Sequence, residues 1–274
     1  SEMLASGYTS VAEFHYLHNQ PGGEVYPDPA EMSLRLIGAA SASGIAMTLL
    51  PVLYCTAGFG KEGVNGEQNR FANSPDEYLR LLEHCKSAVG EKPLIELGIA
   101  PHSLRAVPGP VLHEVLQSWP DRQCPVPIHI AEQPAEVEEC KKPLGARPVE
   151  YLLDQFPVDA RWCLVHATHL SDSELRSAAQ SGATAGLCPT TEADLGDGVF
   201  KTAEWLKAGG RFAIGSDSNV RISVSEELRL LEYNERLRSG QRNVLAGDVM
   251  NCGSFLYQHA ARSGAVALGQ PVGR

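Results

Sequence analysis

The chain has 274 residues, of which 43% are hydrophobic and 20% are charged. This composition excludes a disordered or collagen-like protein, and the length fits one or two domains or a single α/β barrel of roughly 250 residues. With 23 basic and 33 acidic residues the formal net charge is −10. That balance argues against a nucleic-acid-binding protein, because such proteins usually carry a basic stripe.

Seven cysteines are spread along the chain, and no two of them form a C-x-x-C pair. An odd number without that spacing is typical of free, buried thiols in a reducing compartment rather than of disulfides or a cysteine zinc site. No apolar run reaches the roughly 18 residues of a membrane span, and no signal-peptide core is found. We therefore expect a soluble cytoplasmic protein that binds neither membranes nor nucleic acids.

Short apolar runs alternate with longer amphipathic segments along the chain. The predicted strands are, in chain order, Thr9–Phe14, Ile45–Tyr54, Leu94–Ala100, Val126–Ala131, Trp162–His166, Thr184–Cys188 and Arg211–Gly215. The predicted helices are Pro29–Ser43, Pro75–Val89, Pro148–Phe156, Asp172–Ser181, Thr202–Ala208, Val224–Ser239 and Asp248–Arg262. Nearly continuous apolar strands that alternate with helices indicate a parallel sheet covered on both faces and built from right-handed βαβ units.

Three helix starts carry capping signals. Asp28 is expected to cap the helix that begins at Pro29, and Ser74 the helix that begins at Pro75. Ser171 with Glu174 predicts a capping box.

The number of predicted strands is one short of a closed barrel. Seven strands fall one below the eight of a (β/α)8 TIM barrel. Ser1–Gly7 is typical of the last turn of a helix that ends at a C-cap glycine. We therefore predict an α/β fold, an incomplete TIM barrel in which strands 2–8 are present and strand 1 lies upstream of Ser1.

Four side chains with catalytic potential stand at the ends of three predicted strands: His129, Glu132, His166 and Asp217. Catalytic groups of α/β barrels lie at this end of the strands. Each residue alone also has an ordinary interpretation, a structural histidine or an aspartate that caps the next helix. Two imidazoles and two carboxylates at one mouth nevertheless favour a catalytic zinc, which takes three protein ligands and keeps a position for water. The remaining groups could then shuttle protons and polarise the bond under attack.

These motifs resemble those of the amidohydrolase superfamily, in particular its deaminase branch with one metal ion. That branch also carries a His-x-His pair on the first strand, and this chain contains none. Within the branch, three segments resemble the formimidoylglutamate deiminase family: Gly7–His18 (GYTSVAEFHYLH), Ala100–Val107 (APHSLRAV) and Pro127–Gln133 (PIHIAEQ). The resemblance extends along essentially all 274 residues.

The resemblance implies zinc-dependent hydrolysis of N-formimino-L-glutamate to N-formyl-L-glutamate and ammonia, a step of histidine degradation. It assigns His129 and Asp217 to one zinc ion, with two further histidine ligands expected upstream of Ser1. It makes Glu132 the proton carrier between water and the leaving nitrogen, and lets His166 hydrogen-bond the water or the reacting carbon's substituents. Asp217 could take the first proton.

The resemblance also implies a division of the chain. Residues 1–264 would form the barrel domain, truncated at its N-terminus, and residues 265–274 would begin the return to a small β domain. The chain on its own is then expected to be inactive.

The substrate carries two carboxylates, so its pocket needs cations or hydrogen-bond donors. Arg105, just past a predicted strand end, is the best match, because a guanidinium binds a carboxylate with two hydrogen bonds. Tyr16 and His18 could donate to the same carboxylates. A solvated surface arginine and ordinary loop packing are the alternatives for these three positions. Arg221 is a weaker candidate, and no role is assigned to His102. The other histidines, expected to be structural or exposed, are His15, His84, His113, His169 and His259.

Two other functions remain open. A deaminase of the same branch acting on guanine, cytosine or a related ring would favour aromatic stacking, yet aromatic residues make up only 7% of the chain. A metal-free barrel that acts as a binding module would also lack first-strand histidines, and an upstream His-x-His pair would eliminate it. Analogy with similar acidic barrels favours a homodimer.

Overall fold

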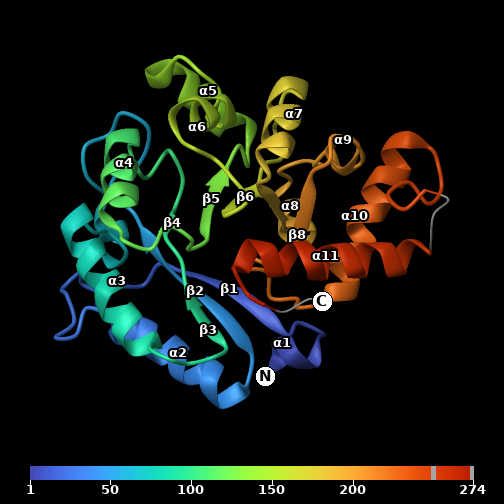
Figure 1. Ribbon diagram of the computed structural model, residues 1–274. Helices are drawn as coiled ribbons and strands as arrows, with labels where there is room; N and C mark the ends of the chain where they lie inside the picture. Colours follow the sequence, from blue (N-terminus) through green and yellow to red (C-terminus); the bar gives the residue numbers. More distant parts are fainter. Residues whose placement is uncertain (248–250, 272–274) are drawn as a thin grey trace. The chain divides into compact units, whose positions relative to one another are not determined.

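The structure is a computed structural model, and it describes residues 1–247 and 251–271. Its strands are β1 (Ser10–His15), β2 (Ala46–Leu53), β3 (Ile95–Leu97), β4 (Ala100–Pro101), β5 (Val126–Ile130), β6 (Trp162–His166), β7 (Thr184–Leu187) and β8 (Arg211–Ile214) (Figure 1). The helices up to the middle of the chain are α1 (Glu2–Ala5), α2 (Glu31–Ser43), η1 (Gly66–Arg70, a 3-10 turn), α3 (Pro75–Val89), α4 (Gly109–Ser118) and α5 (Pro134–Leu144). The later helices are α6 (Pro148–Gln155), α7 (Asp172–Ser181), α8 (Pro189–Leu195), α9 (Thr202–Lys207), α10 (Val224–Ser239) and α11 (Cys252–Leu268).

The chain forms two compact units. The first contains the described residues of Ser1–Tyr8, His129–Ala267 and Pro271–Arg274, and the second contains Thr9–Ile128 with Leu268–Gln270. One sheet has the order β1-β2-β3, with β4 also paired to β2, and the other has the order β5-β6-β7-β8. The pairs β1–β2, β2–β3, β2–β4, β6–β7 and β7–β8 are all parallel. The parallel α/β architecture expected from the alternation of strands and helices is therefore present.

The predicted division at residue 264 is not marked by a break in secondary structure. Helix α11 continues through Leu268. The last residues of the predicted second domain, 272–274, lie outside the described residues. The first predicted residues of this helix, at Asp248, also lie outside them. The assignment of residues 1–264 to a barrel and 265–274 to a second domain stays a prediction.

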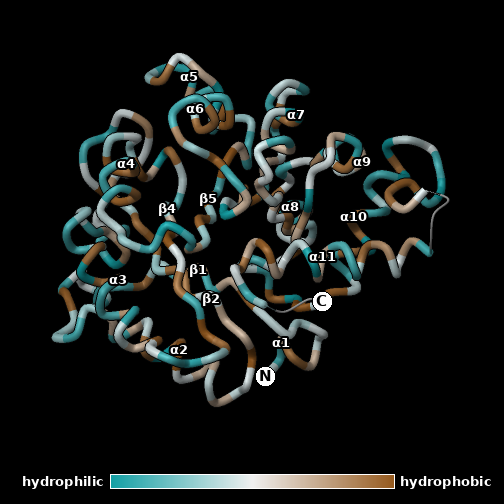
Figure 2. The backbone as a smooth tube through the Cα atoms, viewed as in Figure 1, coloured by the Kyte–Doolittle hydropathy of each residue, from teal (hydrophilic) through white to brown (hydrophobic). Residues whose placement is uncertain are grey.

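Strand β2 shows why the hydrophobic pattern was informative. All eight of its residues are buried, and its tube is mostly in the hydrophobic colour (Figure 2). A strand covered on both faces needs no alternation of polar and apolar residues. In the part of the chain that the structure describes, no helix combines the length and the apolar character needed to cross a membrane.

The predicted strand Leu94–Ala100 is divided in two, which corrects the sequence analysis. Strand β3 pairs with Met47–Leu49 and β4 pairs with Val52–Leu53, so the break lies opposite Leu50 and Pro51. Proline has no N–H to give to a ladder. The Tyr78 hydroxyl bridges the break: it donates to Pro51 O at 2.9 Å and accepts from Ala100 N at 3.0 Å. A Cβ on Gly98 would lie 2.5 Å from Leu50 Cδ2 and 2.8 Å from the backbone oxygen of Pro125, so the close approach here requires glycine.

Helix starts agree with two of the three predicted caps. Ser74 accepts from Glu77 N at 3.3 Å, and Ser171 accepts from Glu174 N at 3.2 Å, each within a capping box. Asp28 is not the N-cap of α2, which begins at Glu31; its carboxylate instead accepts from Ala30 N at 2.8 Å. Helices α4, α5 and α8 were not predicted, although each has a proline in its first turn, a position at which proline favours a helix start.

Helix α8 is attached to α10 through a buried glutamate. Glu227 on α10 accepts from Thr190 N at 2.9 Å and from Thr190 Oγ1 at 2.5 Å. Burial raises the pKa of Glu227 to about 7, against the opposing effect of these two hydrogen bonds. The native state therefore holds a proton on this carboxyl that the unfolded chain releases above its ordinary pKa of 4.5.

We expect Tyr78→Phe to lower the free energy of unfolding by about 1–3 kcal/mol, because it leaves the buried Ala100 N–H and Pro51 C=O without their shared partner. Urea unfolding measures the loss. Tyr233→Phe, at a tyrosine that is 50% exposed, is the matched control and should change stability little. Equal stability of both variants would contradict the role given to the Tyr78 hydroxyl.

We expect Glu227→Gln to remove a pH dependence of stability. The native pKa lies above the unfolded one, so this carboxyl destabilises the fold increasingly as pH rises from about 4.5 to about 7. The wild type should lose on the order of 3 kcal/mol relative to the variant across that window. Urea unfolding of both proteins at pH 5 and pH 8 measures the difference. A wild-type profile parallel to that of the variant would show that Glu227 titrates normally.

Candidate active site

The predicted strand-end residues His129, Glu132, His166 and Asp217 all belong to the first unit. His129 lies in β5, His166 ends β6, Glu132 follows β5 and Asp217 follows β8. The His166 side chain is only 1% exposed, and those of Glu132 and Asp217 are 21% and 26% exposed. A buried imidazole with partly open carboxylates is an arrangement that a small solute can reach.

These side chains gather around His166. Its Nε2 lies 3.5 Å from Asp217 Oδ2 and 3.8 Å from Glu132 Oε1. The His129 ring is tilted against the His166 ring, with 5.5 Å between their centroids. Burial lowers the pKa of His166, but the hydrogen bond to Glu192 and the charges of the three carboxylates outweigh burial and raise it above its ordinary value. The strand ends thus meet as expected; whether His129 and Asp217 share one metal ion stays a prediction.

The backbone at these strand ends has an unusual conformation. The structure describes five non-glycine residues with positive φ, and four of them are Ala131 (50°), His166 (64°), Ala167 (49°) and Asp217 (52°). Left-handed backbone costs free energy for residues with a Cβ and is concentrated at functional sites. These turns direct His166 and Asp217, and the chain between His129 and Glu132, away from the regular path of a strand.

Two buried glutamates that the sequence analysis missed hold this loop geometry. Glu136, in the first turn of α5, accepts from Ala131 N at 3.0 Å and from Glu132 N at 2.9 Å. Glu192, in α8, accepts from Cys188 N at 2.9 Å and bonds to His166 Nδ1 at 3.2 Å. The only available sequence signal was an acidic residue in the first turn of each helix, which usually indicates a favourable interaction with the helix dipole.

The chemistry of the donor set fits a divalent metal. His129 and Asp217 offer one imidazole nitrogen and one carboxylate, both of which zinc accepts. Three carboxylates, Glu132, Glu192 and Asp217, surround a single buried imidazole, and this excess of negative charge favours a bound cation. His166, Cys188 and Glu192 also place ligand atoms within 4.8 Å of one another.

The predicted substrate residues Tyr16, His18 and Arg105 belong to the second unit. Arg105 is half-buried, and within the described residues its guanidinium forms no ion pair with a carboxylate. His18 is buried and its Nε2 lies 2.8 Å from Val52 O, which leaves Nδ1 without a partner. Burial lowers the pKa of His18 to about 4. His18 Nδ1 is the ring nitrogen left for another contact, and the predicted contact of His18 with substrate stays a prediction.

His102, to which no role was assigned, lies among aromatic rings. Its ring centroid is 4.9 Å from that of Tyr54, 5.3 Å from Tyr16 and 6.5 Å from Phe14. Its Nδ1 is 2.9 Å from Ser103 Oγ. The sequence did not predict this cluster because its rings come from separate segments of the chain.

The remaining candidates have structural surroundings. Arg221 is exposed and pairs with Glu226 at 2.7 Å, so the structure gives no support to a substrate role. His15 is buried against Ser33 Oγ at 2.8 Å, and His259 stacks on Phe212 with 4.6 Å between ring centroids. His169 Nε2 lies 2.6 Å from Asp197 O, and His84 is half-exposed near Asp28.

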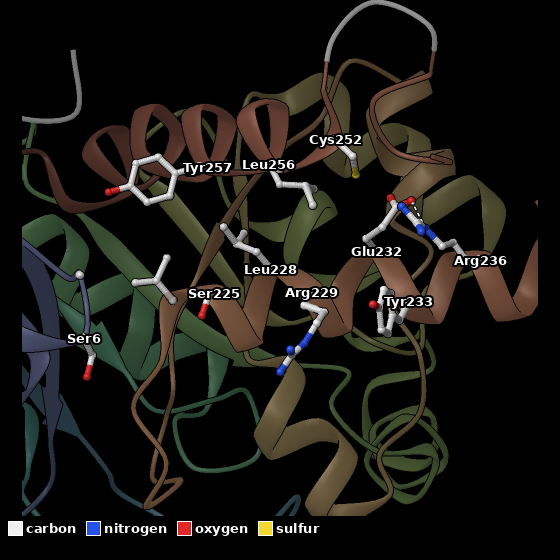
Figure 3. Close-up of a pocket in the computed structure, with 13 residues that line it drawn as sticks. Ser6, Ser225, Leu228, Arg229, Glu232, Tyr233, Arg236, Cys252, Leu256 and Tyr257 are labelled. Carbon is white, nitrogen blue, oxygen red and sulfur yellow. Dashed lines mark hydrogen bonds and ion pairs between the residues drawn. The ribbon is translucent and has the colours of Figure 1, made fainter. Parts of the chain in front are cut away.

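A pocket of about 440 Å³ lies elsewhere in the first unit, between α10, α11 and the end of α1 (Figure 3). It is lined by Leu228, Leu256, Tyr233 and Tyr257, and by the Glu232–Arg236 ion pair. None of the four strand-end residues lines it. Volume alone therefore does not identify the reactive part of this unit; the grouping of titratable side chains does.

Comparisons with known proteins identify the family of the chain. The amidohydrolase family model matches residues 1–255. A formimidoylglutamate deiminase from Pseudomonas aeruginosa is 51% identical over 273 residues, which is 99% of this chain and 60% of that protein. A 5-methylthioadenosine/S-adenosylhomocysteine deaminase from Archaeoglobus fulgidus is 28% identical over 86% of this chain and 51% of its own length.

Solved structures show the same fold. An amidohydrolase from Brucella melitensis is 49% identical, with a TM-score of 0.95 over 98% of this chain and 60% of that one. An adenosine deaminase from Xanthomonas campestris with bound zinc has a TM-score of 0.78 at 23% identity, over 98% of this chain and 54% of that one. The predicted amidohydrolase type of α/β fold is confirmed, and the chain spans about 60% of the length of its more similar relatives. The chain belongs to the amidohydrolase family.

Proposed function

We propose that this chain carries the catalytic groups for hydrolysis of N-formimino-L-glutamate to N-formyl-L-glutamate and ammonia, a step of histidine degradation. The observation that carries the proposal is the grouping of Glu132 and Asp217 around His166, in a chain 51% identical to a formimidoylglutamate deiminase. Water adds to the formimino carbon, the bond from that carbon to the terminal nitrogen breaks, and the nitrogen leaves as ammonia.

Zinc is the cofactor we propose, with His129 and Asp217 as its ligands in this chain. Zinc would make water acidic enough to attack near neutral pH. The adenosine deaminase of similar fold was crystallised with zinc, which supports the choice of metal.

The chain's own groups would move the protons. Hydrolysis moves two protons from water to the departing nitrogen. Asp217, whose Oδ2 lies 3.5 Å from His166 Nε2, would accept the first when water attacks and pass it to the nitrogen. Glu132, 21% exposed beside the same imidazole, would carry the second from water to the departing nitrogen. His166 would hydrogen-bond the oxygen that develops on the reacting carbon.

Arg105 would bind a substrate carboxylate, with Tyr16 as a second donor. A half-buried guanidinium without a carboxylate partner among the described residues is suited to an anionic ligand. His18 would contribute its unpartnered Nδ1 as an acceptor.

Deamination of a nucleoside ring is the second candidate. The aromatic rings around His102 would suit stacking on a base, and the Archaeoglobus relative is named as a 5-methylthioadenosine/S-adenosylhomocysteine deaminase. The two functions are distinguished by measuring ammonia release from N-formimino-L-glutamate and from 5′-methylthioadenosine with the complete gene product. We expect release from the first substrate only, and release from the second alone would replace the proposal.

In the complete gene product, Glu132→Gln should lower kcat by about 10²–10⁴-fold, because the amide keeps the shape but cannot carry the proton. Zinc content, measured by elemental analysis, should be unchanged. Glu138→Gln, at an exposed residue that pairs with Lys141, is the control and should retain activity. Near-normal turnover by Glu132→Gln would show that the proton travels by another route.

Arg105→Ala should raise KM for formiminoglutamate. Loss of a charge-assisted hydrogen bond costs about 1.5–3 kcal/mol, equivalent to about 10- to 150-fold. Unfolding should change by about 1 kcal/mol or less. Arg35→Ala removes an exposed arginine that pairs with Glu31 and serves as the control. Unchanged KM and kcat in Arg105→Ala would remove Arg105 from the site.

A further inference from the structure

Glu192 connects the imidazole of His166 to the start of α8. A single oxygen, Oε1, lies 3.2 Å from His166 Nδ1 and 2.9 Å from Cys188 N. Glu192 is 5% exposed and His166 is 1% exposed, so water does not replace either contact easily. Because a carboxylate only accepts hydrogen bonds, Nδ1 of His166 carries a proton and donates it, whatever the charge of the ring.

This bond determines what His166 presents to the site. With Nδ1 held by Glu192, Nε2 is the atom that faces Asp217 Oδ2 and Glu132 Oε1. The left-handed backbone of His166, with φ of 64°, gives the ring its direction but leaves rotation about its side-chain bonds free. A partner on the opposite side of the ring removes that freedom.

Glu192 is itself held in place by the start of α8. Glu192 N donates to Cys188 O at 2.9 Å in the first turn of α8. Thr190 in that turn is bonded to Glu227, and Thr191 Oγ1 donates to Ser216 O at 3.0 Å, next to Asp217. Helix α8 therefore ties the position of Glu192 to α10 and to the end of β8.

We propose that Glu192 is a positioning residue for the reaction: it holds His166 so that Nε2 points at the reacting centre. The assignment rests on the proposed function for its kinetic consequence, while the hydrogen bond itself can be tested without turnover. Glu192 does not touch the group that reacts; it acts through His166.

A metal ion held by His166, Cys188 and Glu192 is the competing interpretation, since their ligand atoms lie within 4.8 Å of one another. One observation weighs against it. Glu192 Oε1, the oxygen that such an ion would need, already lies at hydrogen-bond distance from Cys188 N (2.9 Å) and His166 Nδ1 (3.2 Å).

The kinetic test compares Glu192→Ala with Glu192→Gln in the complete gene product. Alanine removes the acceptor, so kcat should fall by about 10- to 100-fold, the usual size for a carboxylate that orients a functional histidine, with KM and zinc content unchanged. Glutamine keeps a carbonyl oxygen for both donors and should restore most of kcat. Glu232→Gln, which alters a buried carboxyl of α10 that pairs with Arg236 rather than with Thr190 or His166, should retain wild-type kcat.

The spectroscopic test follows the ring nitrogens by NMR of protein labelled with ¹⁵N-histidine, with His166 assigned by comparison with His166→Asn. The wild type should show a proton on Nδ1 that exchanges slowly, and Glu192→Ala should lose it. A wild-type ring protonated only on Nε2, or wild-type kcat in a folded Glu192→Ala variant, would overturn the proposal. Loss of zinc in Cys188→Ser would also overturn it, in favour of the competing metal site.

Failure of the proposed function has a different signature. If the wild type does not hydrolyse N-formimino-L-glutamate, the substrate assignment is wrong, yet the ¹⁵N spectrum still decides whether Glu192 holds His166.

Discussion

A buried imidazole surrounded by carboxylates is the constraint on which the first unit depends. His166 is almost fully buried and has Glu192 on one ring nitrogen and Glu132 and Asp217 on the other. Three carboxylates near one imidazole repel one another in surroundings of low dielectric, and the arrangement is favourable only when a cation offsets them. The negative charge of these carboxylates raises the pKa of His166. A bound metal ion would offset their mutual repulsion more fully than a protonated imidazole does.

The surrounding fold keeps this unfavourable arrangement in place. Left-handed residues at three strand ends turn the chain where regular strands would continue. Buried glutamates then fix the turns through backbone N–H groups: Glu136 holds the loop after β5, and Glu192 holds the start of α8. Glu227 on α10 acts in the same way, because its carboxylate accepts hydrogen bonds from the backbone N–H and the hydroxyl of Thr190 at the start of α8. Each carboxylate satisfies orphan donors at a helix start or strand end, so the cost of its burial is partly offset by hydrogen bonds.

Much of the fold and part of the site could be predicted from the sequence, because both depend on local patterns. Apolar runs bounded by turns located the strands, and strand ends located His129, Glu132, His166 and Asp217. The break opposite Pro51 could not be predicted, since it needs the Tyr78 hydroxyl from another element. Glu136 and Glu192 looked like ordinary first-turn acids, and their partners become visible only when separate loops meet. The hydrogen bond from His18 Nε2 to Val52 O could not be predicted for the same reason, because its two partners are far apart in the chain.

In the proposed site the strand-end cluster would hold one zinc ion through His129 and Asp217, while Glu192 keeps His166 turned toward the reacting centre. Anomalous diffraction at the zinc edge from crystals of the complete gene product would locate the ion. We expect one zinc peak within bonding distance of His129 and Asp217, with His166 Nδ1 still on Glu192. A zinc peak bonded to His166, Cys188 and Glu192, or no zinc at His129 and Asp217 in zinc-loaded crystals, would show that these assignments are wrong.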